Sequence, residues 1–329
     1  MSNFALPMAL PNFPAAIRDA GSSFAPARLA ACVSFSLVDD SDIPQAVQLL
    51  SAMLADSELQ IRIQSIESLA ALVERGADVD RASMQCVYEN GHADLRAVLL
   101  QNGRQLLSSP LIAAIDAASS KDELLRYSAA VSLGAMLDDE KAQEIRNVLL
   151  TLLDDESMEV RITAAFQLGA RGSEKSAVLL ESLVESQDDK AIEAMIILAQ
   201  LGLSRSRKVL ENVAQRRFAP PALRAMASTA LIRMYGNSYF SGLNDMLQSW
   251  RKSRRLAALR ACAAIPSDSL AETLAHHVVS AVGEDEQSAA LWALWQVVSK
   301  YPHCAPVLNE LRVHLGKSLT DELSEYGKG

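Results

Sequence analysis

The chain carries few side chains whose types and spacing suit catalysis or metal binding. Two adjacent pairs, His276-His277 and His303-Cys304, contain metal-ligating side chains. Neighbouring residues on a helix point about 100° apart, so neither pair suits a single metal ion. Residues 249–252 contain a Ser-x-x-Lys spacing, and residues 172–176 lack the GxxxxGK[ST] spacing of a phosphate loop. With no HExxH and no GxSxG in the sequence, we expect no metal site, no cofactor and no catalytic centre.

The cysteine pattern indicates a reducing compartment. Cys32, Cys86, Cys262 and Cys304 are scattered, with no CxxC pair, which argues against a disulfide framework or a structural zinc site. No apolar run approaches the ~18 residues of a membrane span, and no basic segment opens a signal peptide. We therefore expect a cytoplasmic protein. The Ala-, Ser- and Phe-rich segment before Asp39 leaves an organellar transit peptide as the alternative.

The distribution of charge is the strongest chemical signal in the sequence. The whole chain has a net charge of −9, yet residues 205–260 hold twelve cations against two acids, a net charge of +10. Residues 138–193 hold fourteen acids against six cations, a net charge of −8. Such asymmetry creates a field that steers charged partners. The predicted partner-binding residues are Arg205, Arg207, Lys208, Arg216, Arg217, Arg224, Arg251, Lys252, Arg254, Arg255 and Arg260.

Three interpretations of this basic segment remain open. Its cations can be ordinary solvated helix residues, since Arg and Lys favour helices. They can bind an acidic protein surface. They can also bind nucleic acid, with Tyr235, Tyr239 and Trp250 stacking on bases. The acidic remainder of the chain argues against a long nucleic-acid footprint, so we favour the protein partner.

A short helical phrase recurs about every 30 to 35 residues and indicates the elements that position these charges. It covers residues 160–169 and returns at 125–134 and 223–231. Self-similarity at this period is typical of stacked helical repeats. The sequence predicts an all-α, right-handed α-solenoid of about eight helical hairpins. Their ranges are 43–54 with 58–74, 80–89 with 92–107, 110–118 with 121–137, 141–153 with 156–170, 174–186 with 189–201, 204–217 with 220–235, 238–250 with 253–264, and 268–282 with 285–299.

The two ends of the chain depart from this pattern. Residues 1–25 contain Pro7, Pro11 and Pro14, which interrupt helices, and we expect an N-terminal arm laid over the first repeats. A partner-binding tail is the alternative. Residues 26–329 are expected to form one solenoid, closed by a capping helix near 303–316.

Glycines mark the expected ends of several helices. Gly134, Gly169, Gly202 and Gly236 come just after helical segments, where a left-handed residue commonly ends a helix. We therefore expect all four to adopt that conformation.

An arginine recurs in the second helix of most pairs, and two of these arginines follow an acid by six residues. Asp56 precedes Arg62, and Asp155 precedes Arg161, while Arg96 and Arg126 occupy the equivalent position in other repeats. This Asp-x5-Arg pattern, followed by Ala-Ala and Leu-Gly, resembles the HEAT repeat, specifically the short type also found in phycobilisome lyases. The resemblance covers about residues 40–300 and implies that Asp56, Arg62, Arg96, Arg126, Asp155 and Arg161 link neighbouring repeats structurally.

The resemblance implies a non-catalytic scaffold or adaptor that binds a protein through its solenoid surface, in agreement with the missing catalytic motifs. It would place Arg224, Arg254, Arg255 and Arg260 on or beside the concave side. Two enzyme alternatives come from HEAT-like families. An alkylpurine DNA glycosylase would use Asp245, Trp250 and Arg251, and a phycobilin lyase would act as a chaperone-like enzyme. Self-association of the basic and acidic repeats is a further alternative.

Overall fold

The computed structural model describes residues 10–102, 105–137, 141–281 and 283–315. Every regular element in these residues is helical, with 19 α-helices and six short 3-10 helices. The chain divides into two compact units, unit 1 (Met1–Gln167) and unit 2 (Leu168–Gly329). The predicted all-α fold class is therefore confirmed.

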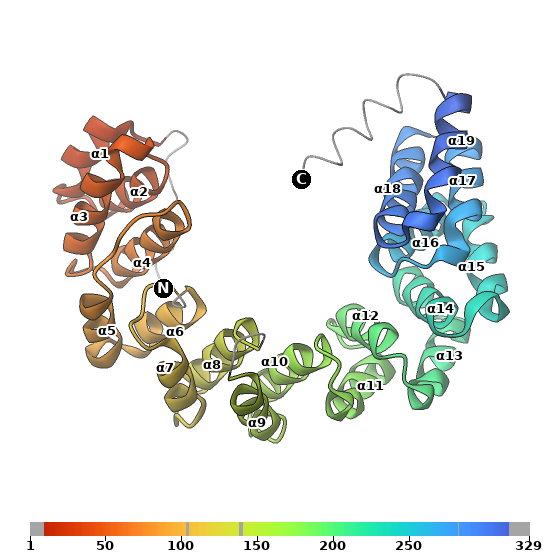
Figure 1. The fold of residues 1–329 in the computed structure, drawn as a ribbon, viewed down its shortest axis with the longest axis horizontal. Helices are drawn as coiled ribbons and strands as arrows, with labels where there is room; N and C mark the ends of the chain where they lie inside the picture. The colour runs from red at the N-terminus through yellow and green to blue at the C-terminus, as the bar shows by residue number, and fades with distance from the viewer. Residues whose placement is uncertain (1–9, 103–104, 138–140, 282, 316–329) are drawn as a thin grey trace. The chain divides into compact units, whose positions relative to one another are not determined.

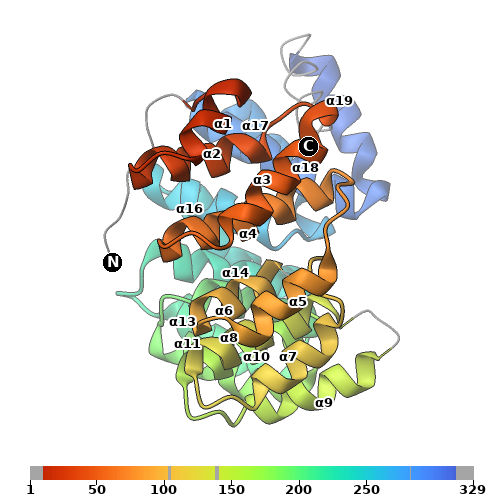
Figure 2. The same ribbon diagram turned by 90° about the vertical axis from the view of Figure 1, so that its left-hand side faces the viewer.

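Unit 1 is a stack of helical pairs. Its helices are α1 (Phe13–Ala20), α2 (Ala25–Ser36), η1 (Asp40–Asp42), α3 (Ile43–Met53), α4 (Leu59–Glu74), α5 (Arg81–Asn90), α6 (Ala93–Asn102), α7 (Pro110–Ala118), α8 (Glu123–Ala135), α9 (Ala142–Leu152) and α10 (Met158–Gly169), of which the last two residues belong to unit 2. Each odd-numbered helix from α1 to α7 packs on the helix that follows it. The second helices form a continuous row, in which α2 packs on α4, α4 on α6 and α6 on α8 (Figure 2).

Unit 2 repeats this arrangement. Its helices are η2 (Glu174–Ser176), α11 (Ala177–Ser186), α12 (Ala191–Leu201), η3 (Ser204–Ser206), α13 (Arg207–Gln215), α14 (Pro221–Tyr235), η4 (Gly236–Tyr239), α15 (Phe240–Leu247), α16 (Lys252–Ala264), η5 (Asp268–Leu270), α17 (Ala271–Ser280), α18 (Glu284–Lys300), η6 (Pro302–Cys304) and α19 (Ala305–Leu315). Helices α12, α14, α16 and α18 form a row of second helices, and α11, α13, α15 and α17 pair with them in turn (Figure 1).

The eight predicted hairpins correspond to helices α3 to α18, and the predicted terminal helix corresponds to α19. Helices α1 and α2 form a further pair ahead of them. Helix α1 lies inside the segment predicted as an arm. It forms despite Pro14 because this proline occupies its first turn, where a missing N–H costs no hydrogen bond. Its Phe13 ring packs edge-on against Phe35 of α2, with 5.9 Å between the ring centroids. Residues 1–9 of the predicted arm lie outside the described residues, and the division into an arm and one solenoid stays a prediction.

Small side chains allow the pairs to pack closely. In α8, Ala129, Ala130 and Leu133 are fully buried. A β-carbon added at Gly134 would come within 2.2 Å of the Gln167 side chain. The glycine therefore serves close packing between neighbouring helices.

The prediction of left-handed glycines at helix ends was right for one of the four. Gly202 follows α12 directly and is left-handed, with φ 64° and ψ 23°. Gly236 follows α14 directly and has a positive φ of 73°, but its ψ of −157° lies outside the left-handed helical region. The prediction was wrong for Gly134 and Gly169, because these glycines lie inside the last turns of α8 and α10. At Gly169 an added β-carbon would meet Ile197 at 2.6 Å, so this glycine also permits a close contact.

Candidate partner-binding site

The arginines of the second helices form buried contacts in unit 1. In α8, the Arg126 guanidinium bonds both carboxylate oxygens of Asp155, at 2.8 and 3.0 Å, and also donates to the backbone carbonyl of Ser120. The exposed fractions of the Arg126 and Asp155 side chains are 8% and 6%. Burial alone would raise the pKa of Asp155, but the hydrogen bonds from Arg126 and from the Ser157 N–H bring the pKa below its usual value. One arginine thus joins its own turn to the next pair of helices.

The same arrangement occurs at two further places. Arg28 in α2 bonds Asp56 at 2.7 Å and the carbonyl of Ser22 at 2.8 Å. Arg255 in α16 bonds Glu286 at 2.7 Å and the carbonyl of Ser249 at 2.7 Å. In each case the carbonyl lies six residues before the arginine, and the acid lies 28 to 31 residues after it. We call these contacts the arginine ladder.

Five of the six residues predicted to link neighbouring repeats make contacts of this kind, to an acid or to a backbone carbonyl. Asp56 and Asp155 accept the arginine of the preceding pair, while Arg62 and Arg161 donate to the backbone carbonyls of Asp56 and Asp155. Arg126 is the donor to Asp155.

Arg96 departs from this pattern. It lies over the Tyr88 ring at 4.9 Å and approaches Asp116 at 3.8 Å. The Nε atoms of Arg62 and Arg96 are buried without a hydrogen-bond partner. No acid occurs 28 to 31 residues after either arginine. The ladder is therefore incomplete at these two arginines.

The second-helix contacts also account for residues that the sequence interpretation missed. Arg28 lies at the ladder position of α2, and Glu286 is the buried acceptor in α18. Glu286 additionally bonds His277 at 2.8 Å, and its pKa is lowered by the hydrogen bond from Arg255. The spacing of 31 residues between Arg255 and Glu286 could have identified this pair in the sequence.

Several cations of the basic segment have structural partners. Arg205 bonds Glu181, Arg207 bonds Glu211, Lys252 bonds Asp285, Arg255 bonds Glu286, and Arg224 donates to the carbonyl of Ala214. The guanidinium of Arg207 also lies over the rings of Tyr235 and Tyr239, at 5.2 and 5.5 Å. These groups are engaged within unit 2, and Arg255 in particular is a ladder residue.

The remaining predicted cations are distributed over different surfaces of unit 2. Lys208 is exposed on α13, Arg254 is half-buried on α16, and Arg260 is exposed on α16. Arg216, Arg217 and Arg251 are exposed in the turns that precede α14 and α16. The basic segment is therefore not one continuous patch of available cations.

Two large aromatic side chains accompany the cations of these turns. Phe218 is 91% exposed, and Trp250 is 83% exposed. The Arg217 guanidinium lies 5.9 Å from the centre of the Phe218 ring, and the Arg251 guanidinium lies 4.8 Å from that of Trp250. Trp250 was singled out in the sequence, whereas Phe218 was not, because the exposure of a single phenylalanine cannot be deduced from the sequence.

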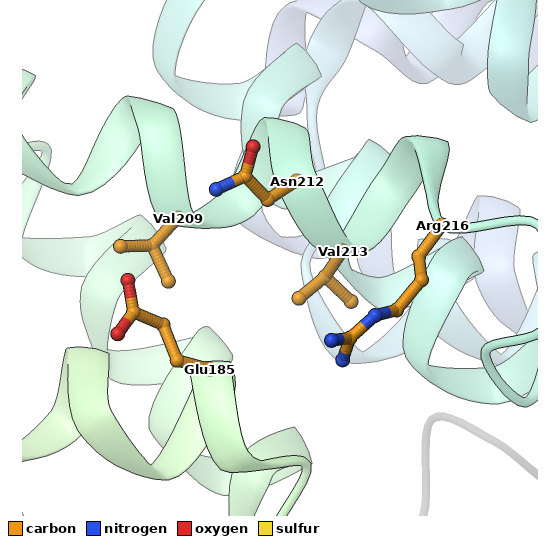
Figure 3. A pocket seen from close by; sticks show the side chains of 5 residues that line it. All are labelled: Glu185, Val209, Asn212, Val213 and Arg216. Carbon is orange, nitrogen blue, oxygen red and sulfur yellow. The ribbon is translucent and has the colours of Figure 1, made fainter.

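A cavity of about 370 Å³ lies between α11 and α13. Its described lining comprises Glu185, Val209, Asn212, Val213 and Arg216. Figure 3 shows the carboxylate of Glu185 and the guanidinium of Arg216 bordering it, with Val209 and Val213 between them. The described lining could bind a charged group through Glu185 or Arg216 and an apolar group through the two valines. It contains no hydroxyl, thiol or imidazole.

A second cavity, of about 390 Å³, lies between α16 and α18. Ala263, Ala264 and Ala289 line it together with Arg260, Trp292 and Gln296. Arg260 is the predicted binding residue in the lining of this cavity, which also contains the aromatic ring of Trp292.

The residues considered for metal binding or catalysis are buried in helices, lie on a helix or lie in a turn. Within the described residues, no three His, Cys, Asp or Glu side chains gather as metal ligands. Cys32 and Cys262 are buried, and burial raises their pKa values to about 11 and about 12. Asp245 lies on α15, while Trp250 and Arg251 contact each other in the following turn.

Comparison with known proteins supports the repeat assignment for part of the chain. Residues 109–200, from α7 to α12, match the family model of HEAT repeats. The chain is also similar to the crystal structure of an engineered protein, with 15% identity over 93% of this chain and 96% of that one. The TM-score of this match is 0.44. No curated protein matches the chain in sequence. Among the described helices, none is both long and apolar enough to cross a membrane.

Proposed function

We propose that this chain is a non-catalytic scaffold whose HEAT repeats bind a protein partner with an acidic surface. HEAT repeats generally mediate protein interactions, and residues 109–200 match that family. The observation that carries the proposal is the set of exposed cations in the turns before α14 and α16, where Arg216, Arg217 and Arg251 accompany two exposed aromatic rings. Partner surfaces are commonly enriched in arginine and aromatic residues.

The cations with structural partners are excluded from this binding role. Reversing the charge of Arg255 would leave Glu286 buried beside a second acid, so the variant would report folding and not binding. We therefore replace the broad basic segment by the turn cations as the binding determinant.

The free cysteines support a reducing location for this scaffold. None of the four forms a disulfide, and Cys32, Cys262 and Cys304 are buried thiols. We place the protein in the cytoplasm on this basis.

The test is affinity purification from the native host with matched baits. The binding variant carries Arg216→Glu, Arg217→Glu and Arg251→Glu. The control carries Arg81→Glu, Lys121→Glu and Lys175→Glu, three exposed cations outside the basic segment, so both variants change the net charge equally. We expect the wild type and the control to retain a stoichiometric protein after nuclease treatment, and the binding variant to lose it.

Two results would contradict the proposal. Loss of every retained species on nuclease treatment would indicate a nucleic-acid ligand. Equal recovery of the same protein by both variants would remove the turn cations from the interaction. Melting temperature and helical content, measured for each bait, separate binding from misfolding.

A further inference from the structure

We propose that Phe218 and Trp250 are paired anchors of one docking edge, and that this edge binds a short acidic segment of a protein partner. The docking edge comprises residues 216–220 and 248–251, the turns inside two consecutive helical pairs of unit 2. This inference rests on the proposed function, since it names the contact points and the kind of segment that a protein partner would present.

The two turns lie at the same edge of unit 2. Helices α14 and α16 pack on each other. Near their C-terminal ends, the guanidinium of Arg233 donates to the carbonyl of Pro266 at 3.0 Å. The two helices therefore run in the same direction, and their N-terminal ends also lie together. Phe218 comes three residues before α14, and Trp250 comes two residues before α16.

Both rings are available to a partner. With exposed fractions of 91% and 83%, they contrast with Tyr235 and Tyr239, whose rings cover Arg207. Large aromatic side chains contribute strongly to binding when a partner buries them. Each exposed ring has a guanidinium near it, so a segment that covers the ring also meets a positive charge.

The local charge favours an acidic ligand. Arg216, Arg217 and Arg251 lie in the two turns, and the N-terminal ends of α14 and α16 add positive partial charge. The short links 202–206 and 265–270 join consecutive pairs at the opposite ends of the second helices, so each internal turn of unit 2 lies at this edge.

The neighbouring turns limit the length of the ligand. Asp188 and Asp189 precede α12, and Glu284 and Asp285 are the first two residues of α18. The basic stretch is therefore two turns long, with acids on both sides. A nucleic-acid strand that continued along the edge would meet like charge, whereas a short acidic protein segment would not. The alternation of basic and acidic turns thus favours a protein segment with acidic and apolar side chains.

The probe is a library of random 12-residue peptides displayed on phage and selected on the full chain. We expect enriched peptides to combine at least two acids with aromatic or aliphatic residues. Fluorescence anisotropy of the synthetic peptides then compares the wild type with the double variant Phe218→Ala, Trp250→Ala. Because we expect the loss of both rings to cost about 2 kcal/mol in total, affinity should fall by about 30-fold.

The control variant carries Ile112→Ala and Val178→Ala, which remove two other exposed apolar side chains, 68% and 62% exposed. It should bind the selected peptides as the wild type does. Both variants change exposed residues, and circular dichroism checks that their helical content is preserved.

Several outcomes would overturn the inference. Selection of no peptides, or of peptides without acids, would contradict the assigned ligand class. If a fluorescent oligo(dT) of 20 nucleotides binds, and its binding depends on both rings, the edge is a binding site for single-stranded nucleic acid. If the charge variant at Arg216, Arg217 and Arg251 loses the host protein while the aromatic variant keeps it, the inference fails and the proposed function stands. If both retain the host protein, the proposed function fails as well.

Discussion

At the scale of single residues, the most informative contact is the buried pair Arg126–Asp155. The recurrence of arginine in the sequence predicted a structural role for these residues, and the structure places Arg126 in a buried ion pair with Asp155. The six-residue spacing alone did not identify the partner of each charge, because the acid six residues before an arginine bonds the preceding arginine of the ladder. Asp56 illustrates this: its carboxylate bonds Arg28, and its backbone carbonyl accepts from Arg62.

Removal of one charge from the buried pair should lower stability strongly. For Asp155→Asn we expect a loss of about 3 kcal/mol in the free energy of unfolding, because the buried Arg126 loses its buried counterion and keeps only the exposed carboxylate of Glu156, at 2.9 Å. Urea unfolding followed by circular dichroism measures this. The control Asp40→Asn breaks the pair with Arg75, in which the Asp40 side chain is 89% exposed, and should change the value by less than about 1 kcal/mol. Equal effects would contradict the structural role of the buried pair.

The ladder also predicts the response to acid. The pKa values of Asp56, Asp155 and Glu286 are lowered in the folded chain. Their contribution to stability is complete above the unfolded pKa values of about 4, and disappears as the pH falls through the lower folded values. We expect the urea concentration at the unfolding midpoint to decrease as the pH is lowered below about 4. This decrease should be less steep for Asp155→Asn than for the wild type. A midpoint that rises towards acid would contradict the assigned direction.

At the scale of elements, periodicity in the sequence predicted the helical pairs well. The predicted pair at 110–118 and 121–137 corresponds to α7 and α8 with small shifts at the ends. The remaining differences arise where short 3-10 turns, such as η2 and η3, precede the first helix of a pair. Gly134 and Gly169 were misinterpreted because a helix-ending glycine and a close-packing glycine look the same in a sequence.

Close packing at Gly169 gives a prediction at this scale. A methyl group there would press on Ile197 and Ser176, which are buried, so Gly169→Ala should lower the free energy of unfolding by about 1–3 kcal/mol. Gly134→Ala should cost less, because its nearest neighbour is the flexible side chain of Gln167. Adding Gln167→Ala should then restore stability to Gly134→Ala. Urea titration of the three variants tests this order, and a larger loss at Gly134 would reverse it.

At the scale of the whole molecule, the count of charges in the sequence overstated the available basic surface. Residues 205–260 sum to +10, but Glu181, Asp285 and Glu286 lie outside that range and bond Arg205, Lys252 and Arg255. Partners that are distant in sequence cannot be assigned by counting within a segment. The exposure of Phe218 and Trp250, and the position of their two turns at one edge of unit 2, likewise come from the structure and not from the sequence.

The acidic partner should bind less tightly as salt is added. Between about 0.1 and about 1 M ionic strength, the Debye length falls from about 10 to about 3 Å. We expect partner affinity to fall across this range for the wild type and for Phe218→Ala, Trp250→Ala, whose cations are intact. The variant with Arg216, Arg217 and Arg251 changed to Glu should show a smaller dependence, measured by anisotropy with the selected peptides. Affinity independent of salt would show that the cations do not contribute.

The arginine ladder also has a consequence for how such a chain can change its length. Each complete rung takes its carbonyl from its own turn and its acid from the next pair of helices, at a spacing of 28 to 31 residues. Duplication or deletion of whole units of this length in the gene keeps the register between the ladder arginines and the positions where an acid can face them. A deletion of half a unit would bury an arginine without one. Recombination in whole repeats is thus the change in length that this fold tolerates best.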